Sequence, residues 1–297
     1  MSTSSSAIAL VLVLPSACAG CQLGREGTGS GSIEADSATT VTDTVEVDFS
    51  DSVESAEADV DAATDISTEE AESDVALREP STILGMTVWL NASGIETDGS
   101  GRVQRWRDLS TFGNDFAQAE VTHRPTLLSV GAVQFSSSWL DGPSLGVLTG
   151  TAGMTLFLVI RPATPVSSSA LCYQTDGVFT DRGAYVGVGL RAGDGYCAFA
   201  YATAYQDTGV LPAKLGTLQI VALRVGVGLL ELTVDGATVT RVIAPVSSLA
   251  AKTLLGRGYL ESLPGAFAVH ELVGYSRPLL ASEIVDVTSY LRAKHKL

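Results

Sequence analysis

Short runs of apolar residues dominate the chain after Pro80. They are rich in Val, Leu, aromatic residues and Thr, and clusters of Gly, Pro, Asp or Ser separate them, which is the pattern of a sheet-on-sheet protein. The predicted strands are 87–92, 132–137, 154–162, 184–190, 196–202, 219–225, 229–242 and 267–275. Within 229–242, Asp235 and Gly236 stand between alternating apolar positions and predict a two-residue hairpin turn.

One helix is predicted, at the end of the chain. Ser282 is the expected N-cap and Glu283 lies in the first turn. An apolar face follows at helical spacing through Ile284, Val287, Thr288 and Leu291. The cations Lys294, His295 and Lys296 stand where the helix dipole favours positive charge. The pattern therefore predicts an all-β domain over residues 81–297 with a short C-terminal helix.

Residues 1–20 are typical of a lipoprotein signal peptide. The apolar run 7–14 has the length of a signal core and is too short to span a bilayer. The small residues Ala19 and Gly20 precede Cys21, which predicts lipidation at Cys21, with Cys18 as the alternative. No Lys or Arg precedes the apolar run, which counts against export. The predicted location is the cell envelope, lipid-anchored at the outer membrane or cell surface.

Residues 21–80 form the predicted linker, and they carry the negative charge of the chain. Between 24 and 80 there are 17 Asp and Glu against two Arg, and the formal net charge of the whole chain is -15. Low apolar content and like charges predict a disordered stalk that lifts the domain off a membrane, with an acidic interaction tail as the alternative. Residues 81–297 are electrically balanced and show no basic cluster, which argues against a nucleic-acid partner.

Five motifs in order resemble the concanavalin A-like lectin/glucanase superfamily, and among its members the laminin-G-like (LamG) modules. They are WLNAS (89–93), DGSG (98–101), WRD (106–108), GNDFAQ (113–118) and RPTL (124–127). The closing segment 266–297 resembles the last strand, turn and terminal helix of these modules. The resemblance spans 84–297 and implies a jelly-roll sandwich of two antiparallel sheets. The chain departs from the family at 136–142, so the resemblance by itself does not imply a calcium or sugar role for that loop.

The resemblance leaves three functional classes open. Glucanases of the superfamily use carboxylates in an E-x-D-x-x-E arrangement on one strand, and 81–297 contains no such triplet. Glu231 and Asp235 share a strand face, but Asp235 belongs to the predicted hairpin turn. The expected protein is therefore not an enzyme and recognises a glycan or a cell-surface protein. A glucanase-type hydrolase and a structural or adhesive spacer domain are the alternatives.

The candidate ligand-binding residues are polar groups on loops and one aromatic. Carboxylate and amide oxygens could hold a sugar hydroxyl or a calcium ion, and a tryptophan could stack on a sugar ring. The alternative for Asp98 and Asp115 is that they cap turns. Trp89 and Trp106 lie in strand-like runs and are expected in the core. No cofactor is required. The candidates are Asp98, Asn114, Asp115, Trp139 and Asp141.

Cys172 and Cys197 both lie in strand-like runs of a domain expected outside the cytoplasm. A disulfide between them suits an oxidising compartment and would contribute about 3 kcal/mol by the loop-entropy model. Two buried free thiols are the alternative.

Overall fold

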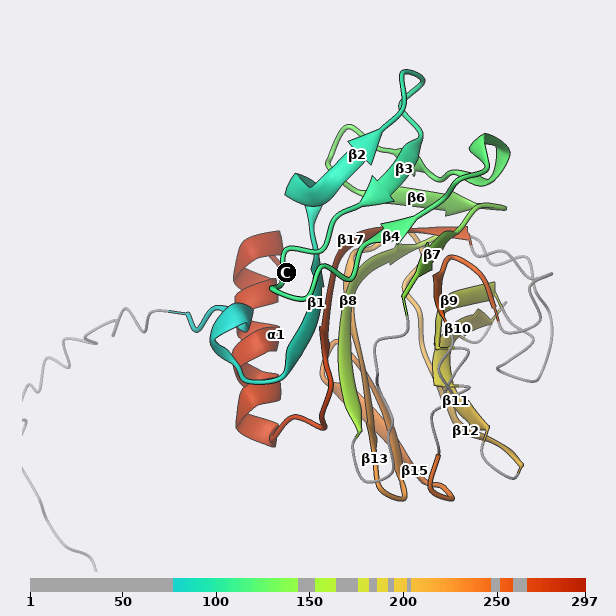
Figure 1. The fold of residues 1–297 in the computed structure, drawn as a ribbon. Coiled ribbons are helices and arrows are strands. Elements are labelled where there is room, and N and C mark those ends of the chain that lie inside the picture. Colours follow the sequence, from blue (N-terminus) through green and yellow to red (C-terminus); the bar gives the residue numbers. More distant parts are fainter. Residues whose placement is uncertain are drawn as a thin grey trace, which may run out of the picture. The chain divides into compact units, whose positions relative to one another are not determined.

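Two antiparallel β-sheets lie face to face, and the helix α1 (Ala281–His295) covers the outer face of one of them (Figure 1). The computed structural model describes residues 77–143, 153–163, 176–181, 186–191, 195–201, 204–246, 252–258 and 266–297. Within these ranges the domain is the predicted jelly-roll β-sandwich with a C-terminal helix.

The first sheet has the strand order β15-β14-β13-β8-β17-β6-β5. β17 (Ala266–Tyr275) pairs with β6 through its first half and with β1 through its second half, so these two strands share one edge of β17. The other bounds are β1 (Met86–Leu90), β5 (Thr126–Leu127), β6 (Val133–Ser136), β8 (Met154–Pro162), β13 (Gln219–Gly226), β14 (Leu229–Val234) and β15 (Ala237–Val242).

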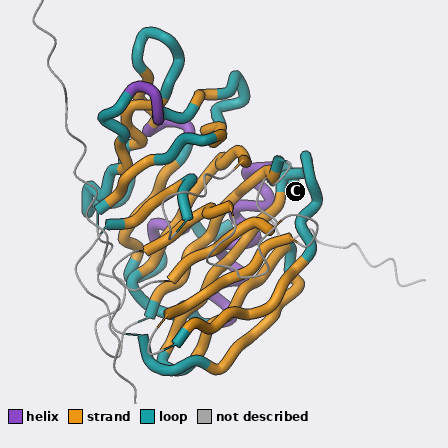
Figure 2. The backbone as a smooth tube through the Cα atoms, turned by 90° about the vertical axis from the view of Figure 1, so that its right-hand side faces the viewer, coloured by secondary structure: helices purple, strands orange, loops and turns teal. Residues whose placement is uncertain are grey.

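The second sheet has the order β12-β11-β10-β9-β16-β7-β4-β3-β2. Figure 2 shows the strands side by side and α1 behind them. The bounds are β2 (Ile95–Thr97), β3 (Val103–Trp106), β4 (Phe116–Ala117), β7 (Leu140–Gly142), β9 (Asp176–Asp181), β10 (Val186–Arg191), β11 (Gly195–Tyr201), β12 (Tyr205–Leu211) and β16 (Thr253–Leu255). Single 3-10 turns are η1 (Pro80–Thr82), η2 (Ala92–Gly94) and η3 (Val121–His123).

The strand period of two builds the main core between the sheets. In β14, Leu230, Leu232 and Val234 are buried there, while the residues between them face outward. Trp106 lies in this core with no exposed surface, as predicted for a core tryptophan. The hairpin predicted at Asp235 and Gly236 is confirmed, because both have the positive φ (50° and 96°) that a tight hairpin turn requires.

A second core lies between the first sheet and α1. It includes Trp89, Phe157 and Tyr275 from the sheet and Val287 and Leu291 from the helix. β8 contributes side chains to both cores and is buried along nearly its whole length. Burial on both faces explains why its sequence, MTLFLVI, is a continuous apolar run rather than an alternating one.

The prediction that Ser282 is the N-cap was wrong, because the helix begins two residues earlier than it implied. The N-cap is Leu280, and Ser282 lies inside the first turn. Glu283 takes over the capping, because its Oε2 accepts the Leu280 backbone N–H (2.9 Å) while its carboxylate also pairs with Arg277 (2.6 Å). The side chain three residues into the helix therefore determines where it starts.

Candidate functional site

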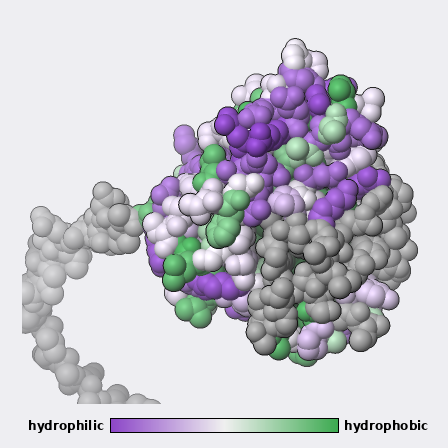
Figure 3. All heavy atoms as spheres, in the orientation of Figure 1, coloured by the Kyte–Doolittle hydropathy of each residue, from purple (hydrophilic) through white to green (hydrophobic). Residues whose placement is uncertain are grey.

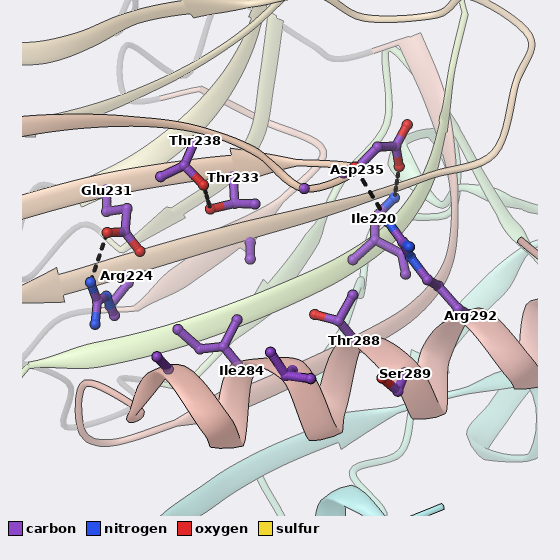
Figure 4. A pocket seen from close by; sticks show the side chains of 14 residues that line it. Ile220, Arg224, Glu231, Thr233, Asp235, Thr238, Ile284, Thr288, Ser289 and Arg292 are labelled. Carbon is purple, nitrogen blue, oxygen red and sulfur yellow. Dashed lines mark hydrogen bonds and ion pairs between the residues drawn. The ribbon is translucent and has the colours of Figure 1, made fainter. Parts of the chain in front are cut away.

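A groove of about 470 Å³ runs between α1 and the outer face of β13, β14 and β15 (Figure 4). Its apolar part comes from Ile220 and Ala222 of β13 and from Ile284 and Val285 of α1. Figure 3 shows further hydrophobic residues at the surface over α1. Val285 is 62% exposed although it is a large apolar side chain. The groove thus offers an apolar surface that is open to solvent.

Strand alternation places the polar groups of the groove on this outer face. On β13, Val221, Leu223 and Val225 enter the main core. The residues between them therefore point the opposite way, toward α1. On β14 and in its turn, the same rule brings three polar side chains to the groove, namely Glu231, Thr233 and Asp235.

An ion pair forms one end of the groove. Arg224 and Glu231 are directly opposite each other on β13 and β14, and Arg224 Nη2 lies 2.7 Å from Glu231 Oε2. Arg224 Nη1 also donates to the Leu279 carbonyl at 3.4 Å. Its Nε is buried and has no hydrogen-bond partner among the residues that the structure describes. Leaving a buried donor unpaired costs about 1–3 kcal/mol.

The hairpin turn forms the other end. Asp235 accepts the Ile220 backbone N–H (3.0 Å) and the Gln219 amide (2.9 Å). Arg292 of α1 donates to the Asp235 carbonyl at 3.3 Å. Between the two ends, the hydroxyls of Thr233 and Thr238 are 2.9 Å apart. The groove therefore has polar ends about 13 Å apart, the rise of four strand residues, with the threonine pair between them and apolar side chains of β13 and α1 alongside.

Asp98, predicted as a ligand, holds a turn. Its Oδ1 accepts from Ser100 Oγ (2.7 Å), Ser100 N (2.9 Å) and Arg102 N (3.1 Å), and its Oδ2 pairs with Arg124 at 3.0 Å. The hydrogen bonds from Ser100 and then from Arg124 hold the pKa of Asp98 well below its usual range. Asp98 therefore has the turn-capping role that was the alternative to ligand binding.

Asn114 and Asp115 are likewise engaged by the protein itself. The Asn114 amide donates to the Thr87 carbonyl at 2.7 Å. Asp115 accepts the Asp108 backbone N–H at 2.8 Å and forms an ion pair with Arg105. These contacts close the loop that follows β3 against β1.

Trp139 stacks between two other side chains. Its ring lies 4.1 Å from the His123 ring and 4.1 Å from the Arg257 guanidinium carbon. One ring face has room for only one such group, so the two neighbours occupy opposite faces. A sugar could stack on Trp139 only by displacing one of them. Asp141 pairs with Lys252 at 3.1 Å.

The structure brings only some of these five residues together. Arg124 pairs with Asp98 and donates through Nε to the Gln118 carbonyl, and Gln118 donates to the Trp139 carbonyl. Asp98 and Trp139 therefore belong to one hydrogen-bonded network. Ligand binding by the five residues stays a prediction, and none of them lines the groove under α1. The alternating LELTV run and its hairpin were the signal for the groove, but they do not reveal that a helix lies alongside.

The predicted lipidation site, Cys21 or Cys18, lies outside the described residues, as does Cys172. Cys197 is buried in β11. Because Cys172 lies outside the described residues, the disulfide between the two stays a prediction. Within the described ranges, no three His, Cys, Asp or Glu side chains are grouped to hold a metal ion. No helix in the same part of the chain has the length and apolar character needed to cross a membrane.

No protein-family model matches the chain, and no curated protein matches it. Solved structures do. The binding domain of Paraclostridial Mosquitocidal Protein 1 matches with a TM-score of 0.52 at 12% identity, over 71% of this chain and 53% of that one. The binding domain of botulinum neurotoxin serotype D matches with a TM-score of 0.50 at 12% identity, over 70% of this chain and 52% of that one.

A third structure is domain 4 of AbnA, a GH43 extracellular arabinanase from Geobacillus stearothermophilus, in complex with arabinotriose. It matches with a TM-score of 0.47 at 15% identity, over 68% of this chain and 97% of that one. This chain spans about half the length of the two binding domains. What the similarity to the two binding domains shows is the fold alone: over the matched part, the chain has the same two-sheet β-sandwich architecture.

Proposed function

We propose that the chain is a surface-tethered lipoprotein whose LamG-like domain recognises a carbohydrate or another surface partner and catalyses no reaction. The groove under α1 is the proposed binding site. Recognition modules need an apolar surface and a few fixed polar groups rather than a reactive centre. The carboxylates of the groove suit that role, because Glu231 is paired with Arg224 and Asp235 is bound into its turn.

The row of hydrogen-bonding groups from the Arg224–Glu231 pair to the Thr233–Thr238 pair, beside the apolar residues of α1, is the observation that carries this proposal. Hydroxyls of a sugar in the groove would exchange hydrogen bonds with Glu231 and with the Thr233–Thr238 pair. The C–H face of a sugar ring would lie on the apolar groove surface formed by Ile220 and Val285. A hydroxylated ligand with one apolar face therefore fits both parts of the groove.

We expect Val285→Arg to reduce binding of the full chain on a glycan array by more than about tenfold, since about 1.4 kcal/mol of lost contact has that effect. The new side chain would project from α1 into the groove. Val285 is 62% exposed, so the substitution should leave folding intact. Binding would be compared at equal concentrations of wild type and variant, after circular dichroism shows equal folding.

Val227→Arg is the matched control, because Val227 is 64% exposed and lies outside the groove. It should bind as the wild type does. Trp139→Ala tests the other surface and should also retain binding. Loss of binding in Trp139→Ala with normal binding in Val285→Arg would move the site to the Trp139 loop. A folded wild type that binds no glycan would contradict the carbohydrate form of the proposal.

The membrane anchor rests on the small residues before Cys21 and on the apolar run 7–14. In a bacterial host that processes lipoproteins, metabolic palmitate labelling of the wild type is expected, and Cys21→Ala should abolish it. Cys18→Ala is the control and should keep the label. Label that survives Cys21→Ala would assign lipidation to Cys18, and an unlabelled wild type would refute the anchor.

A further inference from the structure

β17 contains a bulge that turns two consecutive polar residues toward α1. Val269 and Leu272 both lie in the main core. They are three residues apart, and in a regular strand side chains at that spacing would point to opposite faces of the sheet. The register against β8 shifts between Val269 and Glu271. His270 and Glu271 therefore share the outer face, where they line a cavity of about 360 Å³ together with Lys294 and His295 of α1. Bulges often redirect side chains in this way at functional positions.

Glu271 is fully buried and joins three elements. Its side chain has no exposed surface and accepts from Trp89 Nε1 of β1 (2.6 Å), Lys294 Nζ (2.8 Å) and His295 Nε2 (2.7 Å). Lys294 and His295 belong to the last turn of α1. One carboxylate thus anchors the C-terminal end of the helix to the sheet.

His270 lies beside this anchor. Its Nε2 is buried and makes no hydrogen bond within the described part of the chain. Its ring lies 6.0 Å from the His295 ring. The charged and titratable groups that face the cluster are Arg161 from β8 and Lys294, His295 and Tyr290 from α1. The described residues of β1 and of the 91–93 turn that face the cluster are neutral, namely Trp89, Asn91, Ala92 and Ser93. A proton on His270 would add a positive charge among cations.

We propose that the cluster of His270, Glu271, Lys294 and His295 is an acid-released latch, which holds α1 against β17 at neutral pH and frees its last turns on acidification. Arg292, which forms one end of the groove, lies in the same part of the helix as the latch. Release would therefore open the groove. This second step, the loss of a bound partner in acid, rests on the proposed function, whereas the latch itself does not.

Protonation of His270 and protonation of Glu271 both weaken the latch. Burial, with the charges of Arg161 and His295, lowers the pKa of His270 from 6.5 to about 4. The released state takes up this proton at a higher pH than the latched state, so the latch weakens as pH falls below about 6.5 and the effect is complete near 4. For Glu271, burial raises the pKa, but the hydrogen bonds from His295, Lys294 and Trp89 outweigh it and leave the pKa below its usual 4.5. Its contribution is present above that value and disappears below it.

Hydrogen exchange of the unliganded full chain tests the latch directly. After correction for intrinsic rates, amides of residues 288–295 should exchange about 50-fold faster at pH 4.5 than at pH 7, as the lowering of the His270 pKa from 6.5 to about 4 implies. His270→Gln keeps a polar group but cannot gain the proton, and should lose most of this pH dependence. His123→Gln, at a histidine far from α1 in the sequence, should behave as the wild type. Equal pH dependence in wild type and His270→Gln would overturn the proposal.

The three tryptophan indole N–H signals provide a second readout. The Trp89 signal should shift with pH, because its acceptor is the Glu271 carboxylate. The Trp106 signal should stay constant, because its acceptor is the Asn91 carbonyl. A Trp89 signal that stays constant from pH 7 to 4 would contradict the latch.

If the latch opens while glycan binding is absent, the latch stands and the proposed function fails. If binding occurs and is unchanged when the latch opens, the gating of the groove is wrong.

Discussion

Replacing Glu271 with alanine is expected to lower the free energy of unfolding by about 3–5 kcal/mol at pH 7, the cost of removing one partner from a buried charged cluster. Glu271 has no exposed surface, and three donors from β1 and α1 converge on it. Without the carboxylate, the Trp89 indole N–H and the largely buried His295 would have no acceptor. The loss should therefore affect both the sheet and the end of the helix.

Urea denaturation followed by far-ultraviolet circular dichroism measures this change. Glu120→Ala is the control, because Glu120 also pairs with a histidine but its side chain is 69% exposed. It should stay within about 0.5 kcal/mol of the wild type. Glu271→Gln keeps an acceptor for Trp89 but loses the charge, and should fall between the two. A Glu271→Ala variant as stable as the control would show that the three donors are satisfied by water and that the cluster is no anchor.

Trp106→Ala should cost about 3–5 kcal/mol, the usual range for truncating a large aromatic side chain in a core. Trp106 lies in β3 with no exposed surface, and its Nε1 donates to the Asn91 carbonyl at 2.7 Å. Truncation would leave a cavity between the sheets and remove one of the two donors to the Asn91 carbonyl, which would keep only the Gly94 N–H at 3.1 Å. The same denaturation measurement applies.

Two further variants separate these two losses. Trp106→Phe fills most of the volume but cannot donate, and should cost about 1–3 kcal/mol from the lost hydrogen bond and the smaller ring. Phe112→Ala removes an aromatic ring that is 62% exposed and should change stability by less than about 0.5 kcal/mol. Equal losses in Trp106→Phe and Trp106→Ala would assign the whole effect to the hydrogen bond.

The long elements could be predicted because their local patterns are strong. The strand at 154–162, the Asp235–Gly236 hairpin and the terminal helix all lie where the sequence put them. The short strands β4 and β5, of two residues each, could not be predicted, since two residues show no periodicity. Their strand conformation comes from neighbours already in the sheet. The start of α1 was misjudged because Glu283, bound to Arg277, caps the Leu280 N–H.

The functional surfaces were harder to predict. Among the loop residues predicted to bind a ligand, Asp98 and Asp115 also close turns and form ion pairs, and their ligand binding stays a prediction. The run AFAVHELVGY did contain a usable signal, since two adjacent polar residues interrupt an apolar alternation. Such an interruption indicates a bulge, but it does not say what the two side chains meet.

The sequence alone determined the all-β class, the position of the terminal helix, the hairpin and the core tryptophans, because each follows from the periodicity and turn chemistry of neighbouring residues. The tertiary structure alone decided where α1 lies, which residues form the groove and which groups surround Glu271. Trp89 and Glu271 are 182 residues apart in the chain, and Arg292 and Asp235 are 57 apart. Contacts over such separations depend on how whole sheets and helices come together, and no local pattern encodes them.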